Sequence, residues 1–88
     1  MNEEDILNRI TEKYPDAVID ISGEDCSFEL YIISDAFNGQ RTLQRQQAIL
    51  ALFKNELTSG KLHALGLTIK TQKEQTESLN AGLVQIKL

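Results

Sequence analysis

The chain has 88 residues, of which 41% are hydrophobic and 25% charged. This length holds one small domain, and the composition is that of a globular protein and not of a disordered chain. Nine basic and 13 acidic residues give a net charge of −4, which argues against strong non-specific binding to nucleic-acid phosphates. The single cysteine excludes an internal disulfide framework and a metal site made of four thiolates.

The location of the protein is predicted from its apolar runs and its N-terminus. The longest apolar runs, at 17–21, 28–33 and 48–53, are far too short to cross a bilayer. The first residues, MNEEDI, are acidic where a secretory signal is basic. We therefore expect a cytoplasmic protein that does not associate with membranes.

The N-terminal half predicts a helix followed by two strands. Asn2 can cap a helix over residues 3–13, where acidic residues in the first turn suit the helix dipole. Pro15 ends that helix. The segments AVIDIS (17–22) and SFELYIIS (27–34) are rich in β-branched and aromatic residues, and the turn residues GEDC lie between them. These two segments predict an antiparallel hairpin.

The second half predicts a long helix, a third strand and a short closing helix. The long helix covers residues 42–57 and ends at Gly60, which suits a left-handed cap. Its expected buried stripe consists of Leu43, Leu50, Phe53 and Leu57, with Ile49 and Leu52 beside it. HALGLTIK (63–70) alternates as a strand does, and Thr71 with Glu74 fits a capping box for the closing helix.

The order helix–strand–strand–helix–strand predicts an α+β sandwich, with a three-stranded mixed sheet and its helices on one face. The strand–helix–strand crossover makes the third strand parallel to the second, so both strands begin at the same end of the sheet. Cys26 and His63, the only thiol and the only imidazole, are therefore expected together at that end. Gly39 and the start of the long helix are expected at the other.

The domain organisation follows from this order of elements. We expect one domain over residues 1–79. The tail at 80–88, NAGLVQIKL, is open to three interpretations: an edge strand, a dimer contact or a disordered end.

Several short motifs between residues 37 and 67 follow one another in a specific order. Phe37 and Gly39 form a Phe-x-Gly turn, Arg45 stands near the start of the long helix, Glu56 stands near its end, and His63 with Ala64 precedes the third strand. In this order and spacing the segment FNGQRTLQRQQAILALFKNELTSGKLHALGL resembles the BolA family.

Two details refine this resemblance. The run Arg45-Gln46-Gln47 is similar to a bacterial branch of the family that has a basic residue followed by two glutamines. After the last strand, Gln72 and Gln75 stand where the family often has proline and tryptophan.

The resemblance implies a class II KH-like αββαβ fold and partnership with monothiol glutaredoxins in iron–sulfur trafficking or iron/redox regulation. In such heterocomplexes a [2Fe–2S] cluster is shared, and the glutaredoxin and its glutathione supply thiolates. The BolA-like partner supplies the strand-entry histidine, which His63 matches, and a residue of the loop between the first two strands, for which Cys26 is a candidate. The isolated protein is expected to be a monomer or weak homodimer without a cofactor.

Plainer interpretations of both candidate ligands stay open. The alternative for His63 is a partly exposed residue that is hydrogen-bonded at a strand edge. Cys26 is equally a small loop residue without chemistry, and its acidic neighbours Glu24 and Asp25 disfavour a free thiolate.

Two other classes of function also stay open. One is a KH-like nucleic-acid-binding transcriptional regulator of stress response or morphology, in which Gly39, Arg41 and Arg45 hold a phosphate or DNA. KH domains use a Gly-x-x-Gly loop, of which this chain offers one glycine. The other is an interaction module that binds neither metal nor nucleic acid. We do not expect an enzyme, because no acid/base pair or catalytic triad stands out.

Overall fold

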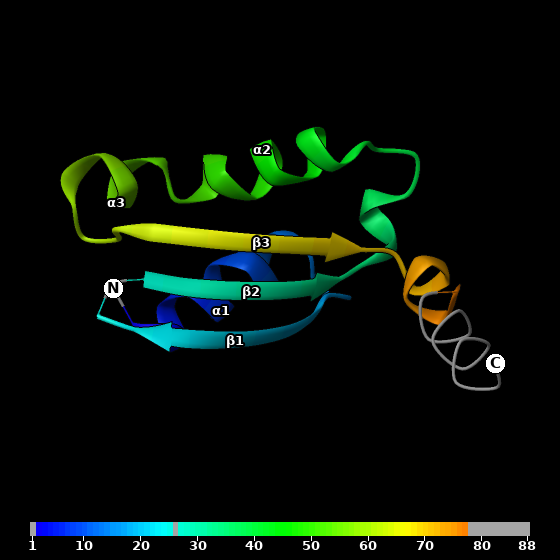
Figure 1. Cartoon of the computed structure of the whole chain (residues 1–88), viewed down its shortest axis with the longest axis horizontal. Helices are drawn as coiled ribbons and strands as arrows, with labels where there is room; N and C mark the ends of the chain where they lie inside the picture. The colour runs from blue at the N-terminus through cyan, green and yellow to red at the C-terminus, as the bar shows by residue number, and fades with distance from the viewer. Residues whose placement is uncertain (1, 26, 78–88) are drawn as a thin grey trace, which may run out of the picture.

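The computed structural model describes residues 2–25 and 27–77, which form three strands with helices before, between and after them (Figure 1). The elements are α1 (Glu3–Lys13), β1 (Val18–Glu24), β2 (Ser27–Ile33), the 3₁₀ turn η1 (Asp35–Phe37), α2 (Thr42–Leu52), α3 (Lys54–Ser59) and β3 (Ala64–Lys70). Residues 72–77 are also helical. The strands lie in the order β1-β2-β3, with β1 antiparallel and β3 parallel to β2. The predicted αββαβ fold with a mixed sheet is confirmed.

Helix α1 begins where its sequence predicts, and two isoleucines bury it against the sheet. The side chain of Asn2 accepts a hydrogen bond from the backbone N–H of Asp5 at 2.9 Å, which caps the helix. Ile6 and Ile10 lie on its inner face and are fully buried. Helical spacing of these two side chains is what turns α1 toward the sheet.

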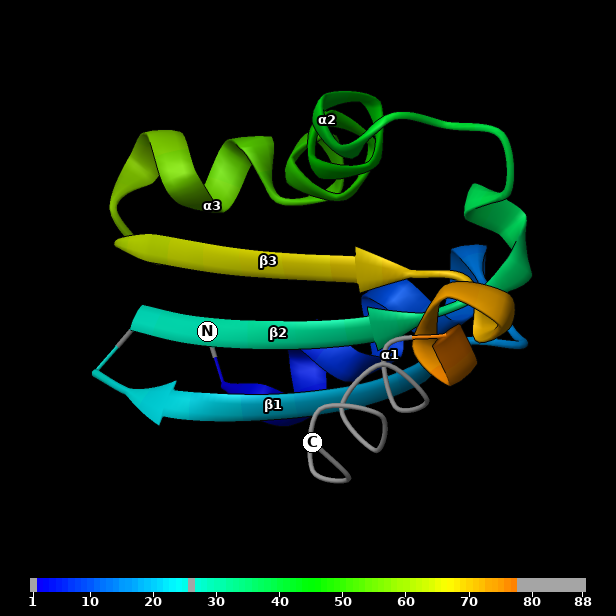
Figure 2. The same cartoon turned by 45° about the vertical axis from the view of Figure 1, so that its right-hand side comes forward.

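The core lies between one face of the sheet and the two main helices. In β2 every second side chain is buried on this face, namely those of Phe28, Leu30 and Ile32. Helix α1 lies behind the strands and α2 runs beside β3 (Figures 1 and 2). The buried core comprises Ile6, Ile10, Phe28, Leu30, Ile32, Phe37, Ile49, Phe53 and Leu62. The opposite face of the sheet carries more exposed side chains, among them Val18.

The predicted single helix over residues 42–57 is wrong in one respect, because it is interrupted at Phe53. The backbone N–H of Phe53 bonds to the carbonyl of Leu50 at 3.0 Å, three residues back, so the turn tightens there. The chain then resumes as α3, and the N–H of Leu57 bonds to the carbonyl of Phe53 at 2.9 Å. The interruption coincides with the fully buried ring of Phe53.

The predicted buried stripe of this helical region also needs correction. Leu43 is 64% exposed and lies on the outer side of α2. The buried positions of α2 are Arg45 and Ile49. An inward-facing arginine turns the helix relative to the expected orientation, and its polar contacts, described below, make that burial possible.

The hairpin between β1 and β2 is tighter than predicted. Gly23 and Glu24, which the sequence placed in the turn, belong to β1, and Glu24 pairs with Ser27. Gly23 has a φ of +125°, and an added Cβ would stand 2.8 Å from the Cα of Phe28. Only glycine fits a position with this backbone angle and this close neighbour.

The closing helix is confirmed with its predicted capping box. The N–H of Thr71 donates to the Glu74 carboxylate at 2.8 Å, and the N–H of Glu74 donates to the Thr71 hydroxyl at 3.3 Å. Residues 80–88, for which we named three interpretations, lie outside the described residues. Within the described part of the chain, every helix is too short or too polar to span a lipid bilayer.

Candidate functional site

His63 stands immediately before β3, between two residues that are held in place. Gly60 ends α3 in the left-handed conformation, with a φ of +84°. Leu62 is fully buried, and its N–H bonds to the carbonyl of Glu56 at 3.0 Å. On the other side of His63, Ala64 begins β3 and pairs with Ser27 of β2. The chain therefore fixes the backbone on both sides of an exposed imidazole.

Such a side chain is suited to ligation. Imidazole is a common ligand of transition metals, and only an accessible ring can be reached by a group that another molecule carries. The fixed backbone reduces the conformational entropy that is lost on binding. The imidazole of His63 is thus accessible to a metal-containing group that another molecule brings to this end of the sheet.

The end of the sheet beside His63 is formed by the starts of β2 and β3. The parallel register pairs Ser27 with Ala64 and Glu29 with Gly66, so both strands begin together, as the crossover predicts. A shallow depression lies here, lined by residues 27–29 and 64–66. Cys26, the other candidate ligand, lies outside the described residues, and its proximity to His63 stays a prediction.

The chemistry of the available donors limits what His63 can hold by itself. Among residues 2–25 and 27–77, no three side chains of the His, Cys, Asp and Glu types form a group that could hold a metal ion. One imidazole is a fraction of a coordination shell, since tetrahedral iron or zinc takes four ligands. The donors present therefore fit a metal group whose other ligands come from elsewhere.

Arg9 and Glu56 support the loop that carries His63. The guanidinium of Arg9 donates to the Glu56 carboxylate and to the carbonyl of Leu52, the latter at 3.0 Å, and lies over the Phe53 ring. The hydrogen bond from Arg9 lowers the pKa of Glu56. These contacts fasten α3 to α1, and the backbone of Glu56 in turn holds Leu62.

The candidate nucleic-acid residues lie near the other end of the sheet, where β2 and β3 finish. Gly39 has a φ of +80° with open space around it, so its role in the turn is conformational. Arg41 is exposed, immediately before α2. Arg45, one turn further on, is only 7% exposed. The three residues do not form a single accessible surface.

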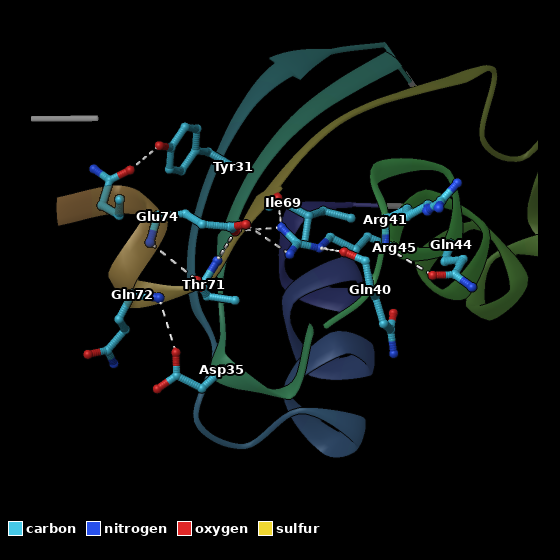
Figure 3. Close-up of polar contacts among 11 residues, drawn as sticks. Tyr31, Asp35, Gln40, Arg41, Gln44, Arg45, Ile69, Thr71, Gln72 and Glu74 are labelled. Atoms are coloured by element: carbon cyan, nitrogen blue, oxygen red, sulfur yellow. Dashed lines mark hydrogen bonds and ion pairs between the residues drawn. The ribbon is translucent and has the colours of Figure 1, made fainter. Parts of the chain in front are cut away.

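The guanidinium of Arg45 is engaged in a polar network (Figure 3). Its Nε donates to the carbonyl of Gln40 at 3.0 Å, and Nη1 donates to the carbonyl of Ile69 at 3.1 Å. Nη1 and Nη2 also bind the two carboxylate oxygens of Glu74 at 2.6 and 3.1 Å. These hydrogen bonds, with that from Thr71, lower the pKa of Glu74 to about 2.

Sequence reasoning missed this network, although it named both of its charged members. The sequence alone suggests a phosphate ligand at Arg45 and half of a capping box at Glu74. Glu74 does form the capping box, and the same carboxylate also binds Arg45. With most of its donors already bonded to protein atoms, Arg45 has little to offer a nucleic-acid phosphate.

Together, the fold and the site define a class of protein: a small αββαβ module with one exposed histidine at the entry to its parallel third strand. Residues 9–74 match the family model for BolA, described as BolA-like protein. The chain belongs to the BolA family.

Individual relatives agree with this assignment. The chain is 34% identical over 74 residues to an uncharacterized protein in the rpoN-murA intergenic region of Acinetobacter guillouiae, covering 84% of this chain and 89% of that one. BolA1 from Arabidopsis thaliana has a similar fold, with a TM-score of 0.72 at 23% identity, covering 81% of this chain and 92% of that one. The BolA domain of SufE1 from Arabidopsis thaliana gives a TM-score of 0.68 at 28% identity, covering 84% and 98%.

Proposed function

We propose that this BolA-family protein is a non-enzymatic partner of monothiol glutaredoxins that co-ligates a bridging [2Fe–2S] cluster through His63. The observation that carries the proposal is the exposed imidazole of His63 on a backbone held by Leu62 and Ala64. Cys26 is the candidate second ligand. The role we assign is iron–sulfur trafficking or iron/redox regulation in the cytoplasm.

The donor chemistry supports a shared cluster. The chain has one histidine and one cysteine, so a partner has to supply the remaining ligands. A monothiol glutaredoxin with glutathione supplies thiolates, which are the usual ligands of iron–sulfur clusters. Replacing a thiolate by a neutral imidazole raises the reduction potential of such a cluster. A centre of this kind suits transfer or sensing.

The contributions of this chain to the complex are specific. His63 offers a ring nitrogen, and it has to be neutral to bind metal. Leu62 and Ala64 hold its backbone. The shallow depression at the starts of β2 and β3 offers a place for partner side chains beside the imidazole.

Anaerobic reconstitution tests the proposal. The protein is mixed with a monothiol glutaredoxin, glutathione, iron and sulfide, and visible circular dichroism follows the cluster. We expect His63→Ala to change the spectrum of the heterocomplex, and Lys73→Ala, an exposed change in the closing helix, to leave it unaltered. Calorimetry without iron shows separately whether each variant still binds the glutaredoxin. An unchanged spectrum for His63→Ala contradicts ligation by this residue.

The nucleic-acid alternative is tested in parallel. With Arg45 bonded internally, Gly39 and Arg41 are its remaining candidates. If the protein binds nucleic acid through these residues, it should bind duplex DNA in a salt-dependent way, and Arg41→Ala should weaken that binding. Absence of binding at low salt removes this alternative.

A further inference from the structure

The outer side of α2 and α3 carries a shallow apolar groove that the proposed function does not use. Leu43, which the sequence placed in the core, points outward from the start of this surface with 64% of its area exposed. We call the surface the leucine groove; it is lined by Gln47, Leu50, Ala51, Lys54, Leu57 and Thr58. His63 is not among these residues, although α3, which lines one end of the groove, lies beside the start of β3 (Figures 1 and 2).

The leucines along this surface recur at a regular spacing. Leu43, Leu50 and Leu57 recur every seventh residue, with Gln47 and Lys54 between them. A seven-residue step returns to nearly the same side of a helix, so the leucines share one side, and the polar Gln47 and Lys54 alternate with them. Residues from both α2 and α3 line the groove, so the interruption at Phe53 does not end the pattern.

The charge around the leucine groove differs from that of the rest of the chain. Between residues 40 and 59 the one acidic residue is Glu56, and its carboxylate binds Arg9. Arg41 and Lys54 are exposed, and neither has an ion-pair partner in the described part of the chain. A protein with a net charge of −4 therefore carries a cation in the lining of this groove, Lys54, and a second cation, Arg41, at the start of α2; we call these two side chains the basic margin.

This charge decides between possible occupants. A second copy of the chain packed groove to groove would bring like charges together, which is unfavourable. The tail at 80–88 carries one lysine and no acidic side chain, so it does not complement the margin either. A helix with apolar residues on one face and acidic residues beside them complements both the leucines and the basic side chains.

We propose that the leucine groove binds an acidic amphipathic α-helix of a partner protein. The leucines contact the apolar face of that helix, and Arg41 and Lys54 pair with carboxylates on its flanks. Helix-in-groove binding of this kind is a recurrent mode of peptide recognition, with anchors at i, i+3 or i+4, and i+7. The proposed contacts include neither a metal nor His63.

Two designed peptides test this proposal with the full-length chain. Both are helix-forming peptides of about 18 residues, long enough to run beside α2 and α3, with leucines at i, i+4, i+7 and i+11. One carries glutamates on the flanks and the other carries lysines. By fluorescence anisotropy at low salt we expect the glutamate peptide to bind at least about tenfold more tightly. Lys54→Glu should reduce or reverse that preference.

Matched variants locate the binding surface. Leu43→Gln should weaken binding of the glutamate peptide by about tenfold. Val18→Gln, a change at a 61% exposed apolar residue of the sheet, should not. Circular dichroism checks that both variants stay folded, which their exposure favours.

Three results overturn the proposal. The first is equal or absent binding of the two peptides. The second is an equal effect of Leu43→Gln and Val18→Gln. The third is self-association of the protein that Leu43→Gln abolishes, which would make the groove a contact between copies.

Discussion

Arg45 and Glu74 lie 29 residues apart in the chain and form a two-point ion pair, with Nη1–Oε1 at 2.6 Å and Nη2–Oε2 at 3.1 Å. The pair connects α2 to the helix at 72–77. Because the same guanidinium also binds two backbone carbonyls, an arginine can occupy a buried position on the inner side of α2. Arg45, which resembles a phosphate ligand in the sequence, thus connects segments of the fold to one another.

Replacing Arg45 should reveal this structural role. Arg45→Ala leaves the carbonyls of Gln40 and Ile69 without their donor, and we expect a loss of about 1–3 kcal/mol in the free energy of unfolding. The exposed Arg41→Ala is the control and should change it by less than about 0.5 kcal/mol. Urea unfolding measures both. Equal values for the two variants would show that the Arg45 network contributes nothing to stability.

Acid should weaken the contact between Arg45 and Glu74. The pKa of Glu74 falls from 4.5 to about 2 on folding, so the folded state favours the ionised carboxylate. Its stabilisation is therefore complete above about pH 4.5 and is lost as the pH falls toward 2. We expect the Tm difference between the wild type and Glu74→Gln to be largest at neutral pH and to shrink across this interval. A difference that stays constant with pH contradicts the assignment.

Two glycines with positive φ should respond differently to alanine. At Gly23 a Cβ meets the backbone of Ser27 and Phe28, so Gly23→Ala should cost at least about 2 kcal/mol. At Gly39 the surrounding space is open, so Gly39→Ala should cost about 1 kcal/mol, the strain of the left-handed conformation alone. Thermal unfolding of both variants shows which substitution lowers the stability more, and we expect this to be Gly23→Ala. A larger loss of stability for Gly39→Ala would mean that the backbone of the hairpin shifts to make room for a Cβ at position 23.

Leu62 should anchor the segment that carries His63. It is fully buried, so Leu62→Ala should reduce the free energy of unfolding by about 2–5 kcal/mol. The same deletion at the exposed Leu43 should cost less than about 0.5 kcal/mol. Amide hydrogen exchange at Ala64 should accelerate in Leu62→Ala beyond what global destabilisation explains. Unchanged local protection would show that β3 holds this segment without Leu62.

Local patterns predicted most of the fold. The extent of α1, the location of β2 and the left-handed cap at Gly60 each depend on near neighbours in the chain, and all are as predicted. The orientation of α2 was missed, because it depends on Arg45 finding partners from distant segments. Counting apolar residues favours the stripe through Leu43, and no local pattern shows that an arginine will be buried instead.

The candidate site was predictable in part. Parallel pairing of β2 and β3 follows from the crossover, and it brings Ser27 and Ala64 together as expected. The exposure of His63 could not be deduced, because it depends on Leu62 filling the core beside it. Whether Cys26 acts with His63 stays a prediction.

The register of the sheet also sets the width of the surface beside His63. Glu24, Ser27 and Ala64 are partners across β1, β2 and β3, so they form a row across the sheet. Two inter-strand spacings make this row about 10 Å wide. Metal–ligand bonds are only about 2 Å long, so a lone ion bound at His63 touches one side of the row. A partner that contacts the whole row has to present a surface about as wide, so contact with Glu24 and Ala64 together distinguishes a bound protein from a bound ion.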